Sequence, residues 1–205
     1  MTTLTPRSVA ATLAAFTVGF CAAAIADNDR NDGDRFSARL SGYNEVHFIA
    51  GAPALRGAIS TQARGNFRAV IDDGASMIHY ELSFEGLESD VTQSHIHFGQ
   101  RHTVGGIVVW LCQTPAGSLG NTPAPAAVAA LTPFCPTPGG TVTGTIVPAQ
   151  VITATGQGID AGEFDEVVRA IRAGRVYANV HSATFGSGEI RGQLRGGDRG
   201  HDDHD

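Results

Sequence analysis

The chain has 205 residues and a formal net charge of −6, a length that supports one domain with a sizeable core. All of its basic side chains are arginine, and the absence of lysine excludes Schiff-base catalysis and Walker-type phosphate binding. The acidic balance also argues against a nucleic-acid partner.

The N-terminal segment predicts export. Arg7 precedes a run of small and apolar residues at positions 9–25, and Ala24-Ile25-Ala26 has the pattern of a signal-peptide cleavage site. A membrane anchor is the alternative, but the run is short and alanine-rich for a membrane span. We expect residues 1–26 to be a signal peptide, whose removal takes away Arg7 and makes the net charge −7. The mature protein would then be secreted or periplasmic, with no transmembrane anchor.

Cysteine usage agrees with this compartment. Cys21 lies in the predicted signal peptide, which leaves Cys112 and Cys135 in the mature chain. An even pair of cysteines in an exported protein predicts a disulfide, and two free buried thiols are the alternative.

The mature chain is dominated by strand patterns. Residues 27–34 are polar and predict a disordered leader, residues 42–57 predict mostly loop, and residues 113–140 predict a long proline-rich loop. Apolar and β-branched residues between turn signals predict strands in chain order over residues 35–41, 65–72, 76–84, the segment around His95 and His97, and residues 107–112, 141–146, 176–181 and 189–194. The turn Asp73-Gly74 makes a hairpin of the second and third strands.

One helix is expected at about residues 160–173. Asp160 and Glu163 have the spacing of a capping box, and Gly174 is placed to end the helix. Its apolar stripe has the i, i+3, i+4, i+7 spacing, with Phe164, Val167, Val168 and Ile171. The tail, residues 195–205, is polar and predicts disorder. Many short strands and one helix predict a mainly β protein, an antiparallel β-sandwich or Greek-key barrel.

The candidate site consists of three histidines. His95 and His97 are one residue apart on a strand and therefore share a face, whereas Ile96 and Phe98 share the core face. His181 occupies the polar face of the strand at residues 176–181. Imidazoles are good ligands for copper and zinc, so these three predict a mononuclear site if covered by loops. The alternative is that they are solvated or hydrogen-bonded polar residues.

Other polar residues have weaker cases. His102 is a candidate fourth ligand, although an exposed loop histidine is the more common situation. Glu81, which shares the polar face of its strand with His79, could support a ligating histidine, but an ordinary cross-strand polar pair is more frequent. His201 and His204 predict weak metal binding or polar disorder. The sequence contains no nucleophile motif and no phosphate loop.

Four sequence blocks resemble the chordin domain (CHRD) family over residues 35–194. They are SGYNEV at 41–46, YELSFEGL at 80–87, SHIHFGQ at 94–100 and ANVHSATFGSGEIRGQL at 178–194. The resemblance implies an extracellular β-rich module, but it does not imply an enzyme, because the family has no settled molecular activity.

A looser resemblance connects SHIHFG and VHS to the copper-zinc superoxide dismutases. It implies copper-ligand positions at His95, His97 and His181 and an anion-guiding role for Arg191, which is otherwise a structural residue of its sheet. The chain lacks a bridging histidine, a zinc-ligand cluster and the matching disulfide spacing, so the resemblance implies at most a copper-only relative. Shared sandwich ancestry without shared chemistry is the alternative.

We therefore expect an exported binding or structural module, rather than an enzyme, with copper or zinc as its hypothetical cofactor. Its partner would be an unknown extracellular or cell-surface ligand. The alternative is a copper-dependent oxidoreductase that resembles superoxide dismutase, and a third possibility is an interaction module without metal.

Overall fold

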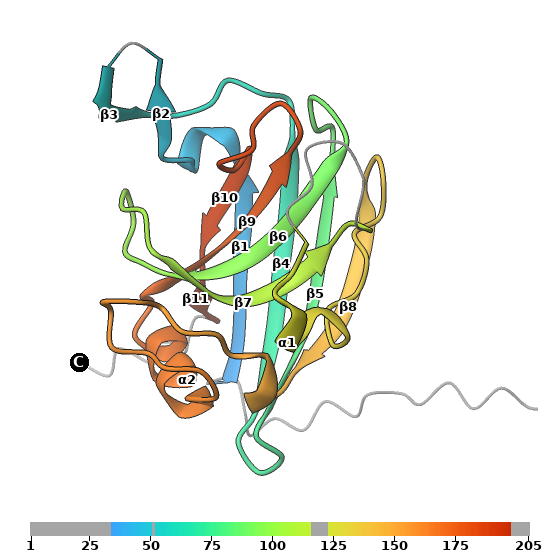
Figure 1. Cartoon of the computed structure of the whole chain (residues 1–205), viewed down its shortest axis with the longest axis vertical. Helices are drawn as coiled ribbons and strands as arrows, with labels where there is room; N and C mark the ends of the chain where they lie inside the picture. Colours follow the sequence, from blue (N-terminus) through green and yellow to red (C-terminus); the bar gives the residue numbers. More distant parts are fainter. Residues whose placement is uncertain (1–33, 51, 116–122, 198–205) are drawn as a thin grey trace, which may run out of the picture.

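The structure is a computed structural model that describes residues 34–50, 52–115 and 123–197 (Figure 1). Its strands are β1 (Arg35–Ser41), β2 (His47–Ile49), β3 (Ala52–Gly57), β4 (Arg64–Asp72), β5 (Met77–Glu85), β6 (Val91–Phe98), β7 (Gly106–Gln113), β8 (Gly140–Ile146), β9 (Val176–Ser182), β10 (Ile190–Gln193) and β11 (Arg195–Gly196). Its helical segments are η2 (Gly42–Asn44), α1 (Ala126–Ala129), η3 (Pro148–Gln150) and α2 (Phe164–Arg172). Within these ranges, no helix has the length and apolar character needed to cross a membrane.

One antiparallel sheet forms the body of the molecule. Its strand order is β7-β6-β9-β10-β1-β4-β5-β8, and β11 pairs with β1. The sheet curves until its two end strands, β7 and β8, approach each other, which gives a nearly closed barrel with the core inside (Figure 1). The predicted mainly β, antiparallel architecture is confirmed.

The predicted hairpin is the clearest example of a local pattern that determines structure. β4 and β5 pair along their whole length, and Asp72 lies opposite Met77 at the turn. Along β5 the burial alternates, and the apolar residues fill the core while His79 and Glu81 are exposed. The two-residue period of a strand therefore fixes which face is buried.

The helix lies as the apolar stripe predicts, but it begins later. α2 starts at Phe164 rather than near Asp160, whose backbone N–H donates to Glu163 Oε2 at 2.8 Å before the first helical turn. All four residues of the stripe are buried. Gly174 adopts a φ of +65° just after the helix, a conformation that glycine reaches without steric cost.

Three loop predictions need correction. Residues 42–57 contain η2 and the separate β2–β3 hairpin, and Pro53 and Gly57 lie within β3 rather than in a loop. Residues 113–140 contain α1 over an alanine-rich stretch. Arg195 and Gly196 were expected in the tail but form β11, which pairs with β1. Gly196 lies opposite Phe36 in this pairing. The predicted signal peptide and residues 198–205 lie outside the described residues.

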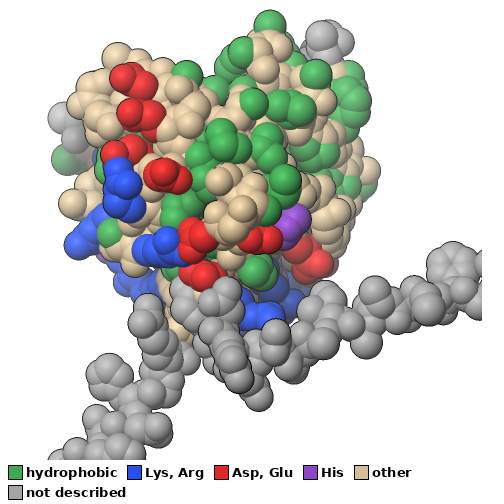
Figure 2. All heavy atoms as spheres, turned by 90° about the horizontal axis from the view of Figure 1, so that it is seen from below, with side chains coloured by type: hydrophobic (Ala, Val, Ile, Leu, Met, Phe, Trp, Pro, Cys, Tyr) green, Lys and Arg blue, Asp and Glu red, His purple; other side chains and the backbone are tan. Residues whose placement is uncertain are grey.

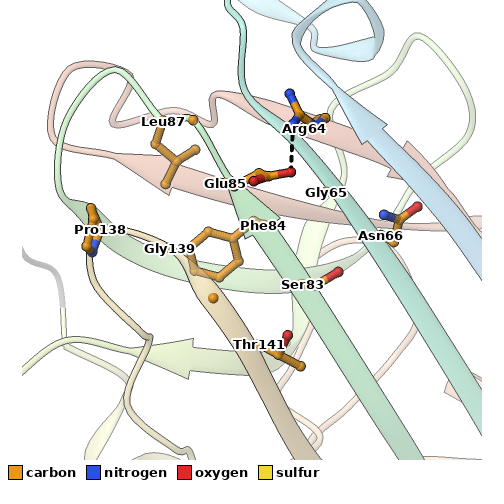
Figure 3. Close-up of a pocket in the computed structure, with 12 residues that line it drawn as sticks. Arg64, Gly65, Asn66, Ser83, Phe84, Glu85, Leu87, Pro138, Gly139 and Thr141 are labelled. Atoms are coloured by element: carbon orange, nitrogen blue, oxygen red, sulfur yellow. Dashed lines mark ion pairs between the residues drawn. The ribbon is translucent and has the colours of Figure 1, made fainter.

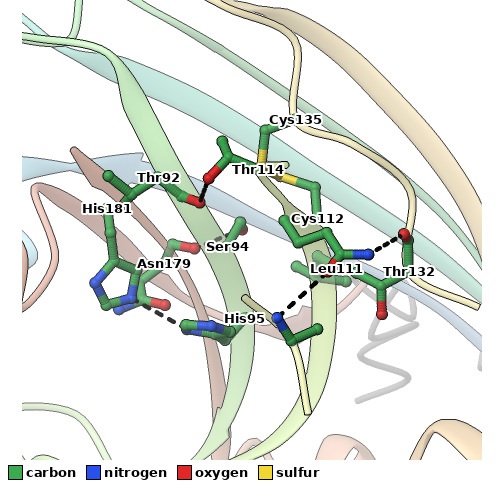
Figure 4. The surroundings of a disulfide bond; sticks show 12 residues. Thr92, Ser94, His95, Leu111, Cys112, Thr114, Thr132, Cys135, Asn179 and His181 are labelled. Atoms are coloured by element: carbon green, nitrogen blue, oxygen red, sulfur yellow. Dashed lines mark hydrogen bonds between the residues drawn. A yellow bond between two sulfur atoms is a disulfide. The ribbon is translucent and has the colours of Figure 1, made fainter. Parts of the chain in front are cut away.

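The predicted disulfide is present. Cys112 on β7 is bonded to Cys135, with an S–S distance of 2.02 Å and a Cα–Cα distance of 5.0 Å (Figure 4). It fixes the proline-rich segment to the end of β7, beside the strand that carries His95.

Candidate metal centre

Two neighbouring strands position the three histidines. β6 lies between β7 and β9 in the sheet. His95 pairs with Asn179, and His181 lies two residues further along β9, opposite Gln93. Residues two apart on adjacent strands share a face and lie diagonally within reach of long side chains. Antiparallel pairing therefore brings His181 next to the H-x-H pair, as the shared-face argument predicts.

The imidazole rings converge on one point. The centroids of the His95 and His181 rings are 4.9 Å apart, and those of His97 and His181 are 6.4 Å apart. His95 Nδ1 lies 3.1 Å from His181 Nε2, and Figure 4 shows the two rings pointing toward each other across the strands. One ring nitrogen from each residue lies within 4.8 Å of the others.

Backbone carbonyls orient two of the rings. His97 Nδ1 lies 2.9 Å from the carbonyl oxygen of Gly105, and His181 Nδ1 lies 3.0 Å from that of Gly186. A carbonyl only accepts, so each Nδ1 carries the proton and donates it. In a neutral ring the Nε2 atom is then left with a lone pair. The second residue of each contact lies in a loop, so the loops determine which nitrogen is free.

Burial keeps the three imidazoles neutral. His95 is 0% exposed, and burial lowers its pKa well below the ordinary value, with further lowering by the neighbouring His181 and His97. Burial likewise lowers the pKa of His97 and that of His181 to about 4. In both cases the hydrogen bond to the loop carbonyl opposes the shift without cancelling it. Neutral imidazole is the form that binds a metal.

The histidine face is covered by other parts of the chain rather than by solvent. His95 packs edge-on against Trp110, with ring centroids 4.2 Å apart. Trp110 in turn contacts Ala124 and Val128, which belong to the segment around α1. The proline-rich loop thus supplies part of the cover that the sequence required.

A stack of side chains supplies the rest of the cover. The Tyr177 ring lies parallel to the His97 ring at 4.7 Å, and the Arg191 guanidinium carbon lies 3.4 Å from the Tyr177 centroid. Arg191 donates to the carbonyl oxygens of Gln100 at 2.9 Å and Thr103 at 2.7 Å. It therefore holds the loop that carries Gly105 against His97, which agrees with the structural alternative for this arginine.

Two polar residues near the histidines were not identified from the sequence. Asn179 Oδ1 and Glu45 Oε2 are buried and accept no hydrogen bond from the described residues. Both lie against Gly188, where an added Cβ would come within 2.7 Å of Glu45 Oε2. Burial raises the pKa of Glu45. Asn179 shares a strand face with His181, a signal that was available, whereas Glu45 comes from a segment with no strand pattern.

The other candidates lie elsewhere. His102 is exposed, and it is not one of the three residues whose nitrogens converge. His79 Nδ1 lies 3.1 Å from Thr145 Oγ1 on β8, and Glu81 is exposed on the same strand as His79. His201 and His204 lie outside the described residues.

Comparison with known proteins places this arrangement in a family. The family model described as "CHRD domain" matches residues 36–194, from the second residue of β1 to the residue after β10. No curated protein and no solved structure matches the chain. The matched segment contains all three converging histidines, and it covers most of the sequence. The chain therefore belongs to the CHRD domain family.

Proposed function

We propose that the protein is an exported CHRD-domain module that binds one metal ion through His95, His97 and His181. The observation that carries the proposal is the convergence of three buried, neutral imidazoles on one face of β6 and β9. Imidazole sets of this kind suit copper and zinc, and the general affinity order of divalent ions favours copper.

The donor set fits a metal ion. Two ligands of one ion, each about 2.1 Å from it, are at most about 4.2 Å apart. The nitrogens lie within 4.8 Å of one another, so a small closing of the rings completes the site. His97 Nε2 is buried and has no hydrogen-bond partner among the residues that the structure describes. Buried polar atoms are nearly always satisfied, so an unpartnered nitrogen beside two other imidazoles supports a bound ligand.

Export is supported by the N-terminal sequence and by the disulfide. Residues 1–26 have the order of a signal peptide, with Arg7 before an apolar run and small residues at its end. The Cys112–Cys135 bond is of a kind that persists in oxidising compartments. A site outside the cytosol would take its metal from the surroundings of the cell.

A binding role is favoured over redox turnover. His95 is 0% exposed and His97 is 7% exposed, so a substrate would reach the ion only past the loops that carry Gly105 and Gly186. Arg191, the anion-guiding residue under the redox alternative, has both of its terminal nitrogens engaged with loop carbonyls. Copper-dependent oxidoreductase activity remains the second candidate because of the H-x-H pattern.

The test is the metal content of the untagged mature protein, measured by mass spectrometry of the native protein and by elemental analysis. We expect one copper or zinc ion per chain. His181→Ala and His97→Gln should each abolish stoichiometric binding, whereas His79→Ala, a matched histidine deletion on the exposed face of β5, should retain it. Circular dichroism checks that the variants fold.

Stoichiometric metal in both site variants would contradict the proposal, as would a metal-free wild-type protein after equilibration with copper and zinc. Superoxide turnover by the copper-loaded protein, lost in His181→Ala, would instead support the redox alternative.

A further inference from the structure

Two adjoining pockets on one side of the barrel are lined by arginine. They have volumes of about 310 Å³ and 390 Å³, and both are lined by Arg101, Gln193 and Arg195. The first also contains Arg39, and the second also contains Arg175. Neither lining includes an aspartate or a glutamate. We call the two pockets together the arginine groove.

The fold gathers these arginines from distant parts of the sequence. Arg39 lies on β1, and Arg195 on β11 pairs with Ser37 of β1. Arg101 follows β6, and Arg175 lies between α2 and β9. Gln193 ties the two flanking segments together, because its Nε2 donates to the carbonyl oxygens of Gly99 at 3.0 Å and Gly174 at 2.9 Å. Figure 2 shows arginine side chains gathered on the side of the molecule that carries α2.

Most of the arginines that line the groove have no ion pair within the described part of the protein. Among residues 34–50, 52–115 and 123–197, no ion pair reaches the four arginines Arg39, Arg101, Arg175 and Arg195. Arg172, which also lines the second pocket, differs from these four because it contacts both Asp34 and Asp73. A pocket of about 620 Å³ beside β4 and β5 differs from the groove in this respect. Its arginine, Arg64, forms an ion pair with Glu85 at 2.9 Å (Figure 3).

The unpaired guanidinium groups repel one another, and a bound anion would relieve this repulsion. In a chain with a net charge of −6, a concentration of four unpaired guanidinium groups marks a local field opposite to that of the whole molecule. Guanidinium groups bind carboxylate and sulfate in a bidentate manner. The groove therefore suits a ligand that carries such groups.

The other lining residues indicate the chemical class of the anionic ligand. Ser37, Asn44 and Gln193 offer hydroxyl and amide groups to neutral hydroxyls of a ligand. The linings contain no phenylalanine, tyrosine or tryptophan, the side chains on which single-stranded nucleic acid chiefly stacks its bases. The two pockets adjoin and share three residues. A ligand that fills both of them must carry anionic groups repeated along its length. We infer that the arginine groove binds an anionic polysaccharide that carries carboxylate or sulfate groups.

The experiment uses the mature chain, residues 27–205, so that the acidic residues near the C-terminus are present as they are in the whole protein. EDTA is present so that no metal bridges protein and polymer. Dextran sulfate and polygalacturonate serve as the two probes, neutral dextran as the uncharged control, and binding is measured by calorimetry at several salt concentrations. Dextran sulfate, polygalacturonate or both should bind, with an affinity that falls as salt increases.

The variant Arg39→Gln/Arg195→Gln should lower the affinity for the bound probe about tenfold, in line with the loss of two surface charge contacts. The control Arg64→Gln/Arg169→Gln removes the same charge from exposed arginines outside the groove and should change the affinity less than about twofold. Unfolding midpoints of both variants confirm that they fold.

Several results would overturn the inference. Equal losses in the two double variants would mean that the polymer senses only net charge. Equal binding of neutral dextran would remove the role of the arginines, and tighter binding of an oligodeoxynucleotide than of either polymer would point to nucleic acid instead. Saturation by inorganic sulfate with no gain for the polymers would indicate a single-anion site. Because these measurements are made without metal, their failure would leave the metal site proposal untouched.

Discussion

His95 differs from the two other clustered histidines because its Nδ1 faces an imidazole nitrogen instead of a carbonyl. His181 donates its Nδ1 proton to Gly186, so its Nε2 is an acceptor. The 3.1 Å contact then requires His95 Nδ1 to donate to His181 Nε2 in the metal-free protein. A metal ion at this point needs both nitrogens as lone pairs. The His95 proton therefore occupies the place of the proposed ion.

We predict that metal binding moves the proton of His95 from Nδ1 to Nε2 without changing the tautomers of His97 and His181. Long-range ¹H–¹⁵N correlation spectra of the protein with and without Zn²⁺, a diamagnetic probe, report the tautomer of each ring. When zinc saturates the site, the neutral His95 ring should change from the Nδ1-protonated to the Nε2-protonated tautomer. A His95 spectrum that stays the same while zinc binds stoichiometrically would show that Nδ1 is not a ligand.

Burial of the histidines also predicts the acid sensitivity of the metal-free protein. Burial lowers the pKa of His97 and that of His181 to about 4, below the ordinary histidine value of 6.5. Between these values the unfolded chain binds more protons than the folded chain, so the free energy of unfolding falls as the pH is lowered through this window. It changes little above pH 6.5 on account of these groups. Each of the two histidines lowers the free energy of unfolding by about 3 kcal/mol at most across this window.

The measurement is urea unfolding of the metal-free protein between about pH 4 and 7.5, a range set by these pKa values. The His97→Phe variant, which removes one buried titrating ring, should show a shallower dependence on pH than the wild type. Parallel curves would mean that the pKa of His97 is the same in the folded and in the unfolded chain. Metal binding should for the same reason persist to lower pH than the ordinary histidine pKa of 6.5 would allow, because the folded rings stay neutral further into acid.

At the scale of elements, the sequence could predict what depends on a local period. β4, β5 and α2 were located by alternation and by the helical stripe, and their buried faces follow from those patterns. The β2–β3 hairpin was missed because β2 has only three residues, two of them exposed, so no apolar alternation marks it. Glu45 was missed for a related reason, since its place beside Gly188 depends on a contact distant in sequence.

The helix supplies a direct test of element packing. Phe164 is 4% exposed and opens the apolar stripe of α2 within the main core. Phe164→Ala should lower the free energy of unfolding by about 3–5 kcal/mol, as for other buried aromatic truncations. Asp165→Ala, at the next and exposed position, should change it by less than about 0.5 kcal/mol. Equal denaturation midpoints for the two variants would show that α2 does not pack against the sheet.

The disulfide supplies a second test at this scale. Cys112 and Cys135 are 23 residues apart and close the segment that carries α1. Closing such a loop stabilises the fold by about 3 kcal/mol in the chain-entropy model. Cys112→Ala and Cys135→Ala should lower the melting temperature by similar amounts, and the double variant should add little. Additive losses would show that the two cysteines act independently of their bond.

At the scale of the whole molecule, the sheet has to be held closed between strands that are not neighbours in its hydrogen-bonded order. β7 and β8 are the ends of that order, and β5 lies next to β8. Tyr80 of β5 reaches across the core and donates its hydroxyl to the carbonyl oxygen of Leu111 on β7 at 2.6 Å. Gly144 on β8 leaves room for this ring, because a Cβ there would come within 2.5 Å of Tyr80 Oη.

This bond should stabilise the closed barrel more than its single hydroxyl suggests. Tyr80 is 4% exposed and Leu111 is 0% exposed, and burial raises the pKa of Tyr80, so the hydroxyl stays a donor. Tyr80→Phe deprives the buried carbonyl of this donor, which should cost about 1–3 kcal/mol of unfolding free energy. Tyr43→Phe removes the same hydroxyl from a side chain that is 73% exposed and serves as the matched control, expected to be neutral. Hydrogen exchange should quicken at β7 and β8 together in Tyr80→Phe, because the two ends of the sheet lose their link across the core. Unchanged exchange at β8 would mean that the ladders alone keep the barrel closed.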